Sequence, residues 1–237
     1  RRCQLEMGGK NPLVILDDAD LDIAVDAAVN GAFFSTGQRC TASSRLIVTE
    51  GIHNRFIEAC VERMQALRVD DALKPGTEIG PVVDDRQLAQ DLDYLAVARR
   101  EGGNIRWGGE RLSRATPGHY LSPALVTDTT PAMRINREEV FGPVASVIRV
   151  RDYEEALAVA NATEFGLSAG ICTASLRHAT HFKRHAEAGM VMVNLPTAGV
   201  DYHVPFGGRK ASSYGPREQG AYAREFYTLV KTAYTRP

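Results

Sequence analysis

Short apolar runs alternate with amphipathic segments along most of this 237-residue chain, and this alternation restricts the possible folds most strongly. A short apolar run between turn residues is typical of a buried parallel strand, while apolar residues at helical spacing indicate a helix. The pattern therefore predicts an α/β fold with a mostly parallel sheet and helices on both faces. Strands are expected at residues 13–16, 46–48, 144–150, 167–172 and 190–193, and residues 120–126 are expected to form a strand or a strand pair. Helices are expected around residues 23–32 and at residues 53–67, 84–100, 153–161 and 175–188.

The first of these helices has recognisable ends and a small apolar face. Asp18 or Asp20 can cap its amino end, and Gly37 is expected to end it. Its inward positions are mostly alanine and glycine, including Gly31. We therefore expect this helix to pack closely against its neighbour.

The pattern changes after Asn194. Residues 196–208 form a loop rich in glycine and proline, residues 217–227 have a helical pattern, and residues 228–234 are β-prone. A β-prone tail carries unpaired backbone groups, which favour pairing with another chain. The sequence thus predicts a C-terminal helix followed by a β tail.

Composition excludes several classes of function. Hydrophobic residues make up 44% of the chain, the net charge is -1 and there is no basic block, which argues against a nucleic-acid partner. No apolar run approaches the roughly 18 residues of a membrane span. The cysteines lack C-x-x-C spacing, which argues against a disulfide framework or zinc site and fits a cytoplasmic location. They are Cys3, Cys40, Cys60 and Cys172, of which Cys60 and Cys172 fall in expected core elements.

One of these cysteines, Cys40, lies in the turn Gly37–Ala42 between an expected helix and an expected strand. A thiol becomes a strong nucleophile as the thiolate, which nearby cations and exposed backbone N–H groups favour. Arg39 supplies a positive charge next to it. The alternative is a buried cysteine that packs as a small hydrophobe.

Two acidic motifs are candidate partners for Cys40. Glu6 lies at what looks like the end of a strand at residues 2–7, beside two glycines where backbone can approach a ligand. Strand ends of parallel sheets are where ligands usually bind, so Glu6 is expected to mark such an end. Taken alone, it could equally be a solvated glutamate. In residues 137–143, acids that include Glu139 precede an aromatic turn at Phe141, and the alternative there is a capped loop before a strand.

Two further motifs carry weaker signals. His178, His181 and His185 share one helix face, and histidines one turn apart can bind a metal ion. Arginine and lysine neighbours favour a solvated basic face instead, so no metal site is predicted. The glycines of residues 205–210 do not form a phosphate-binding motif, and the segment is expected to be a flexible loop of the kind that can line a site.

Taken together and in order, these motifs resemble the aldehyde dehydrogenase superfamily. Leu5-Glu6-Met7-Gly8-Gly9-Lys10 is similar to the general-base motif, with Met7 where leucine is usual, and residues 34–40 are similar to the nucleophile motif. The spacing between Glu6 and Cys40 also matches. Glu139-Val140-Phe141-Gly142-Pro143 looks like the segment that contacts the nicotinamide ribose. Within the superfamily, residues 37–44 and 194–200 look most like α-ketoglutarate semialdehyde dehydrogenases.

The resemblance implies a reaction and a role for each motif. Cys40 would attack an aldehyde, NAD or NADP would accept hydride, and Glu6 would activate water to hydrolyse the resulting thioester. Glu139 and Phe141 would hold the nicotinamide ribose and ring, and the Cys40 N–H would be one oxyanion donor. Arg39 and Thr41 are candidate substrate contacts. Arg39 could instead lower the Cys40 pKa or form a structural ion pair.

The resemblance also implies partners and boundaries. The second oxyanion donor, the adenine pocket and the ribose-binding lysine of the family come from an N-terminal half that this sequence lacks. Residues 1–9 would end the cofactor-binding domain, residues 10–206 would form the catalytic domain, and residues 207–237 would hold the C-terminal helix and oligomerisation strand of a homodimer or homotetramer. Alternatively, the chain is a truncated, non-catalytic folding and oligomerisation fragment that cannot bind NAD(P) alone. A relative that passes the thioester to coenzyme A would tend to lack Glu6.

Overall fold

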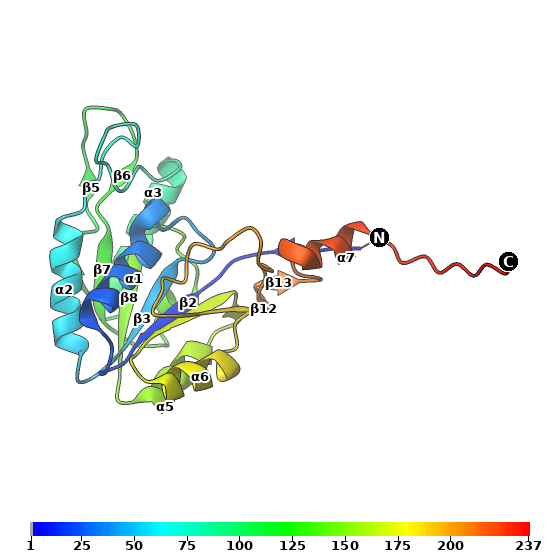
Figure 1. Ribbon diagram of the computed structural model, residues 1–237. Helices are drawn as coiled ribbons and strands as arrows, with labels where there is room; N and C mark the ends of the chain where they lie inside the picture. The colour runs from blue at the N-terminus through cyan, green and yellow to red at the C-terminus, as the bar shows by residue number, and fades with distance from the viewer. Residues whose placement is uncertain (1) are drawn as a thin grey trace.

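The computed structural model describes residues 2–237 and is built on a seven-stranded sheet. The strand order is β11-β10-β2-β3-β8-β7-β4, and every neighbouring pair is parallel except β4 with β7 at one edge (Figure 1). The expected mostly parallel sheet is therefore confirmed. Its strands are β2 (Asn11–Ile15), β3 (Ser43–Thr49), β4 (Asn104–Trp107), β7 (Ala124–Thr129), β8 (Val144–Val150), β10 (Ser168–Cys172) and β11 (Met190–Val193).

The central strands are buried on both faces, which explains their continuous apolar sequence. Successive side chains of a strand point to opposite faces. Leu13 accordingly packs with one hydrophobic cluster and Val14 with the other. Leu46 and Ile47 of β3 divide in the same way, because Leu13 pairs with Leu46 and Val14 with Ile47. A strand in this position has no face exposed to solvent, which favours apolar residues along it.

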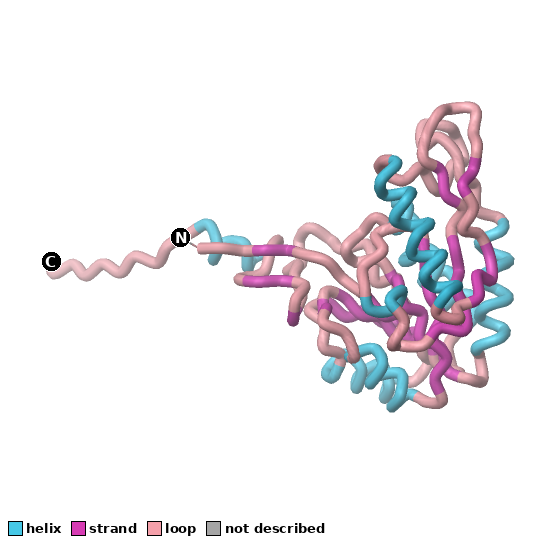
Figure 2. Tube along the Cα trace, turned by 180° about the vertical axis from the view of Figure 1, so that it is seen from behind, coloured by secondary structure: helices cyan, strands magenta, loops and turns pink. Residues whose placement is uncertain are grey.

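Helices cover both faces of the sheet, as predicted (Figures 1 and 2). The first cluster contains residues of α1 (Leu21–Phe33) and α2 (His53–Gln65), and the second contains residues of α5 (Tyr153–Asn161) and α6 (Leu176–His185). The expected close packing of α1 is also present, because a side chain at Gly31 would collide with the Ser43 hydroxyl. Asp20 caps α1 by accepting a hydrogen bond from the Ile23 N–H.

A third cluster joins α3 (Asp85–Arg100) and the short α4 (Arg134–Arg137) to the β7–β8 side of the sheet. Asp84 caps α3 by accepting from the Gln87 N–H. Beyond α3, β5 (Arg111–Leu112) pairs with β6 (Tyr120–Leu121) in a small separate ladder. Of the two alternatives expected over residues 120–126, the structure has two strands, and they pair with different partners.

The C-terminal residues pair with distant segments. β12 (Arg209–Lys210) pairs with β9 (Phe165–Gly166), and β13 (Ser213–Tyr214) pairs antiparallel with β1 (Leu5–Glu6). From Thr228 onward the chain forms no helix or strand and leads away from the body in Figures 1 and 2. Among the described residues 2–237, no strand pairs with the β-prone tail.

Three expected elements differ from the structure. The helix expected at residues 217–227 is only a 3-10 turn, Gly220–Tyr222, followed by α7 (Ala223–Tyr227), because the backbone of Glu218 instead pairs with Phe206. α1 ends at Phe33 and not at Gly37, because a 3-10 turn follows it. The helix expected to run to Ala188 is α6, which ends at His185 because the backbone of Ala186 is already extended. The edge strand β4 was not predicted.

Two further findings concern the described residues alone. Within residues 2–237, no helix combines the length and apolar character that a bilayer crossing requires. Over the same range, histidine, cysteine and acidic side chains form no group of three or more placed to share a metal ion.

Candidate active site

Three loops that carry candidate site residues meet at the amino ends of adjacent strands. The Glu6 motif leads into β2, the Cys40 turn leads into β3, and the Glu139 segment leads into β8. These strands are neighbours in the order β2-β3-β8, so their preceding loops lie side by side. Glu6 itself lies on β1, which is not part of the main sheet. The expectation that Glu6 marks a strand end of the parallel sheet was therefore wrong.

The turn before Cys40 has an unusual backbone that the sequence predicts only at Gly37. Ser35, Thr36 and Gly37 have φ of 53°, 61° and 62°. Non-glycine residues seldom adopt this left-handed conformation. A side chain at Gly37 would also collide with the Gly142 carbonyl group. The loop before β3 is thereby held against the loop before β8, which carries Glu139.

Cys40 is half-buried, and its surroundings differ from the expected cationic ones. Burial raises the pKa of its thiol first, and the nearby Glu139 and Glu6 carboxylates raise it further. The groups that lower this pKa most are the backbone N–H groups of Cys40 and Thr41. Backbone dipoles, and not the charge of Arg39, are therefore the main support for the thiolate.

The two glycines of the first motif allow Cys40 and Glu139 to approach each other. A side chain at Gly9 would collide with the Cys40 carbonyl oxygen, and one at Gly8 would lie 2.5 Å from a Glu139 carboxylate oxygen. The Gly9 N–H donates a 2.8 Å hydrogen bond to Glu139 Oε1. Burial raises the pKa of Glu139, against the lowering by this bond and by the Lys10 ammonium. At Gly9, where the obstacle is the Cys40 backbone, only glycine fits.

Glu6 is positioned by the C-terminal part of the chain. Its partner in the β1–β13 ladder is Ser213, whose hydroxyl donates a 2.7 Å hydrogen bond to Glu6 Oε2. The other oxygen, Oε1, is buried and has no hydrogen-bond partner among the described residues. Burial raises the pKa of Glu6, which the Ser213 bond and Arg217 oppose. Glu6 is thus a carboxylate held by Ser213 through one of its two oxygens.

The remaining predicted residues occupy different environments. Arg39 lines a cleft with Glu139 and Phe141, and within residues 2–237 it forms no ion pair. Phe141 has φ of 60° and is 39% exposed, so its ring is accessible. Thr41 is only 5% exposed and remains a predicted substrate contact.

Sequence reasoning missed two buried basic residues beneath the site. Lys10 and Arg45 are each 1% exposed. Arg45 donates to the carbonyl oxygens of Lys10, Val159 and Ala160, at 3.0 Å in each case. It therefore ties the start of β2 to the end of α5. Burial and the Arg45 charge lower the pKa of Lys10 to about 7. A basic residue inside an otherwise apolar strand segment was the available signal.

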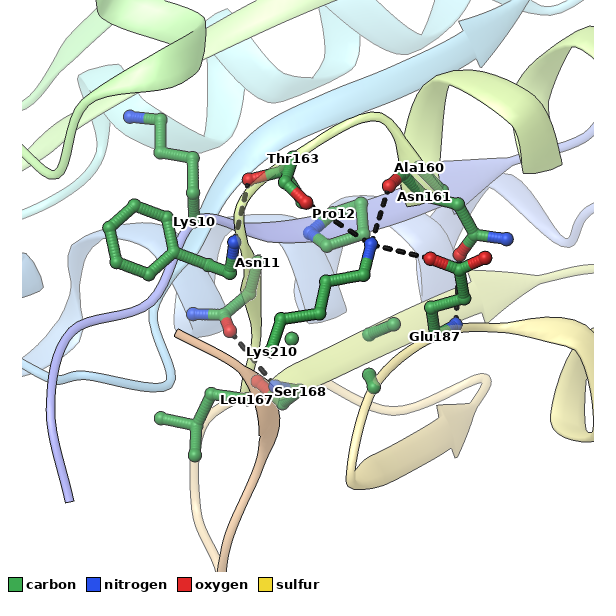
Figure 3. A pocket seen from close by; sticks show the side chains of 14 residues that line it. Lys10, Asn11, Pro12, Ala160, Asn161, Thr163, Leu167, Ser168, Glu187 and Lys210 are labelled. Carbon is green, nitrogen blue, oxygen red and sulfur yellow. Dashed lines mark hydrogen bonds and ion pairs between the residues drawn. The ribbon is translucent and has the colours of Figure 1, made fainter. Parts of the chain in front are cut away.

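A separate cleft adjoins β2, β9 and β10 (Figure 3). Lys210 crosses it and donates to the carbonyl oxygens of Asn161 and Thr163 at 2.7 and 3.1 Å, and it pairs with Glu187 at 2.6 Å. The segment 205–210, expected to be flexible, is therefore anchored at its end.

The three histidines of α6 face α5. His178 stacks on Tyr153 with ring centroids 4.5 Å apart, and the Tyr153 hydroxyl is 2.7 Å from His181 Nδ1. His181 stacks in turn on His185 at 3.8 Å. This side-chain stack joins the two helices on the second face of the sheet.

Asp91 of α3 supports the Phe141 loop and yields a pH-dependent prediction. It is fully buried against Gly142, and burial raises its pKa to about 7 although Gln87 donates a hydrogen bond to it. The folded state therefore holds this proton more tightly than the unfolded state, and stability falls as pH rises from about 4 to about 7. Asp91→Asn should stabilise the fold at pH 8 by a few kcal/mol, with a smaller gain at pH 5.

Chemical denaturation at both pH values checks this expectation. Asp93→Asn on the exposed part of the same helix is the matched control and should change little. An equal gain for Asp91→Asn at both pH values would show that Asp91 does not titrate in this range.

Comparisons with known proteins agree with this geometry. A profile of the aldehyde dehydrogenase family matches residues 1–233. The chain belongs to the aldehyde dehydrogenase family. It is 44% identical over 236 residues to the alpha-ketoglutaric semialdehyde dehydrogenase of Bacillus subtilis (strain 168), covering 99% of this chain and 48% of that protein. It is also 44% identical over 234 residues to a betaine aldehyde dehydrogenase of Cereibacter sphaeroides (strain ATCC 17029 / ATH 2.4.9), again covering 99% and 48%.

Solved aldehyde dehydrogenases share the fold. An NAD-dependent aldehyde dehydrogenase from Sinorhizobium meliloti superposes with a TM-score of 0.93 at 36% identity, covering 98% of this chain and 45% of that one. The betaine aldehyde dehydrogenase of Staphylococcus aureus, solved in complex with NAD+, gives 0.91 at 35% identity, covering 94% and 44%. This aldehyde dehydrogenase chain spans about half the length of the curated relatives that it matches.

Proposed function

We propose that this chain is the catalytic half of an NAD(P)-dependent aldehyde dehydrogenase that oxidises a semialdehyde such as α-ketoglutarate semialdehyde. The observation that carries the proposal is the meeting of Cys40 with two carboxylates, Glu6 and Glu139, at the amino ends of adjacent strands. The similarity to semialdehyde dehydrogenases supports the substrate class. We call this chain together with its cofactor-binding half the intact enzyme.

The reaction assigns one step to each group. The Cys40 thiolate attacks the aldehyde carbon, and its own N–H stabilises the oxyanion of the thiohemiacetal. Loss of hydride from that carbon leaves a thioester on Cys40. Glu6 then takes a proton from water as the water attacks the thioester, which releases the carboxylic acid and restores Cys40. The free Oε1 atom of Glu6 suits it to this role.

The site fits the nicotinamide end of NAD or NADP, which would accept the hydride when bound. Glu139 Oε1 is held by Gly9, and within the described chain its Oε2 atom accepts no hydrogen bond, so it is available for a ribose hydroxyl. The accessible ring of Phe141 can pack against the nicotinamide ribose or ring. The adenine end would be held by the cofactor-binding half. Residues 1–9, of which 2–9 are described, would belong to that half, and residues 10–206 would form the catalytic domain.

The proposal is tested by adding aldehyde and NAD or NADP to the intact enzyme and following the absorbance of the reduced cofactor. We expect turnover with ω-carboxy aldehydes. No turnover with any aldehyde or either cofactor would overturn the proposal. The second candidate, a fragment that only folds and assembles, is examined by titrating NAD into this chain alone and is separated from the proposal by joining the chain to a cofactor-binding half. This second candidate predicts that the chain alone shows no saturable binding of NAD. It also predicts no aldehyde turnover after the chain is joined to a cofactor-binding half.

Arg39 provides a prediction about substrate preference. The guanidinium has no ion-pair partner among the described residues, and burial lowers its pKa, so an anionic partner would be favourable there. We propose that it binds the carboxylate at the far end of the substrate. Arg39→Leu should narrow the preference for ω-carboxy over neutral aldehydes about tenfold or more in kcat/KM, because such a bond contributes about 1.5–3 kcal/mol.

Arg39→Lys, which keeps the charge, should retain part of this preference. If Arg39→Leu slowed both substrate types equally, Arg39 would support Cys40 and would not select the substrate.

The C-terminal tail provides a prediction about assembly. Residues 207–237 would form the oligomerisation segment, and the tail exposes large apolar side chains that include Leu229, Val230 and Tyr234. Such an exposed β-prone segment favours pairing with another copy. Deleting residues 228–237 from the intact enzyme should reduce its dimer or tetramer to smaller species in size-exclusion chromatography with light scattering. An unchanged mass would exclude this role.

The four cysteines are unpaired, which supports the predicted cytoplasmic location.

A further inference from the structure

Three consecutive carbonyl groups of the Cys40 turn accept hydrogen bonds from side chains of other elements. Asn11 Nδ2 donates to the carbonyl oxygens of Cys40 and Ala42, at 2.8 and 2.9 Å. Thr197 Oγ1 donates to the Thr41 carbonyl oxygen at 2.7 Å. None of these bonds lies within the turn itself, so the turn is held from outside by β2 and by the loop after β11.

The two donors are themselves fixed. Asn11 is 2% exposed, and its Oδ1 accepts a 3.0 Å hydrogen bond from the Ser168 N–H of β10, as Figure 3 shows. This bond orients the amide so that its nitrogen faces the turn. Thr197 is fully buried and lies 2.7 Å from Ser43 Oγ. Because the Thr197 proton is used by the Thr41 carbonyl, Ser43 must donate to Thr197.

Because a peptide group is planar, a hydrogen bond that fixes its carbonyl group also fixes the direction of its N–H group. In a trans peptide, the C=O of one residue and the N–H of the next point in opposite directions. Asn11 holds the Cys40 carbonyl, so the Thr41 N–H points away from Asn11. This N–H group is one of the two backbone groups that lower the pKa of the Cys40 thiol.

Thr197 fixes the direction of the Cys40 N–H group through two hydrogen bonds in series. Thr197 fixes the Thr41 carbonyl, and the N–H of the same peptide, that of Ala42, donates a 3.0 Å hydrogen bond to the Arg39 carbonyl oxygen. The Arg39 carbonyl in turn sets the plane that carries the Cys40 N–H. That group is the second backbone N–H that lowers the pKa of the thiol.

We propose that Asn11 and Thr197 are positioning residues that aim the backbone N–H groups of Thr41 and Cys40 at the Cys40 sulfur and at the oxyanion formed beside it. This inference rests on the proposed role of Cys40 as the nucleophile. In this role neither side chain has to contact the substrate. Asn11 acts through the peptide group between Cys40 and Thr41. Thr197 acts through two peptide groups that the hydrogen bond from the Ala42 N–H to the Arg39 carbonyl connects.

The test measures the pH dependence of alkylation of Cys40 by iodoacetamide in the intact enzyme without aldehyde or cofactor, with the modified peptide identified by mass spectrometry. Thr197→Val keeps the side-chain volume but removes the donor. It should raise the midpoint of the profile by about one pH unit, because a hydrogen bond to the thiolate is weakened. Thr197→Ser keeps the hydroxyl and should restore the normal midpoint. Asn11→Ala should shift the midpoint in the same direction.

Thr129→Val is the matched control. Thr129 is also buried, and its hydroxyl donates a 2.7 Å hydrogen bond to a backbone carbonyl, that of Val147, which lies outside the Cys40 turn. A merely structural role for Thr197 would lower the thermal midpoint as Thr129→Val does and leave the alkylation midpoint unchanged. That outcome would overturn the proposal. If Asn11→Ala fails to fold, the comparison of Thr197→Val with Thr197→Ser still tests the proposal.

The same preparation separates this inference from the proposed function. Aldehyde turnover by the unmodified enzyme is measured in parallel. A shifted midpoint without any turnover would support the positioning role and overturn the proposed reaction. Turnover with an unshifted midpoint would support the reaction and overturn the positioning role.

Discussion

Cys40→Ser will abolish aldehyde oxidation by the intact enzyme, with a loss of about a thousandfold or more in kcat. A serine hydroxyl ionises far less readily than a thiol. The surroundings of Cys40 add to this difference, because burial and the Glu139 and Glu6 carboxylates already oppose a negative charge at this position. Two backbone N–H groups that stabilise a thiolate cannot generate an alkoxide at neutral pH.

Steady-state formation of reduced cofactor measures this loss, and Cys3→Ser is the matched control. Cys3 is exposed, and the substitution makes the same chemical change away from the site. Its activity should equal that of the unmodified enzyme. If Cys40→Ser retained more than a few per cent of the activity, the nucleophile would have to be a different residue.

Glu6→Gln should give the second largest effect, and that effect should fall on one step only. The first equivalent of reduced cofactor should form in a normal burst, since hydride loss does not need Glu6. Steady-state turnover should then slow by about 10²–10⁴-fold, the usual contribution of a general base. Ser213 can still donate to the glutamine side-chain oxygen, so the side chain should keep its position.

Rapid-mixing measurements of the burst and of the steady rate separate the two steps. Glu138→Gln is the control, because Glu138 lies beside Glu139 but is bound by Arg134 and Tyr94, which hold its pKa at about 2. The loss of the burst in Glu6→Gln would contradict a role confined to thioester hydrolysis.

The raised pKa of Glu6 adds a pH dependence to this step. Glu6 is active as the carboxylate, and burial raises its pKa above the ordinary 4.5. Hydrolysis in the unmodified enzyme should therefore slow as pH falls through this raised value, at a higher pH than for an exposed glutamate. The burst amplitude should not follow the same curve.

The sheet could be predicted from sequence because its central strands leave no choice of residue. Val144–Val150 has the predicted bounds because it lies inside the sheet and nearly all of its residues are buried. Met190–Val193 also has the predicted bounds, because all four of its residues are apolar although it is an edge strand. β4 was missed because it is a mostly exposed edge strand that contains Arg106 and Trp107 in a polar context. The C-terminal helix was overestimated because a local pattern cannot show that Glu218 pairs with Phe206.

The site was only partly predictable for a related reason. Its motifs are local, so Cys40, Glu6 and Glu139 could be found by their neighbours in sequence. Their supports are distant: Ser213 lies 207 residues from Glu6, and Thr197 lies 156 residues from Thr41. The sequence also suggested that Arg39 sets the Cys40 pKa, whereas burial and two carboxylates raise it. A neighbour along the chain is not always a neighbour of the reacting atom.

The most direct test of the proposed mechanism is mass spectrometry of the Glu6→Gln enzyme quenched in acid after one turnover with cofactor and aldehyde. Cys40 should carry the acyl group of the substrate as a thioester, found on the peptide that contains Cys40 and absent from Cys3, Cys60 and Cys172. The adduct should disappear when Cys40 is also replaced by serine. A full burst of reduced cofactor with no acyl group on Cys40 would contradict the account.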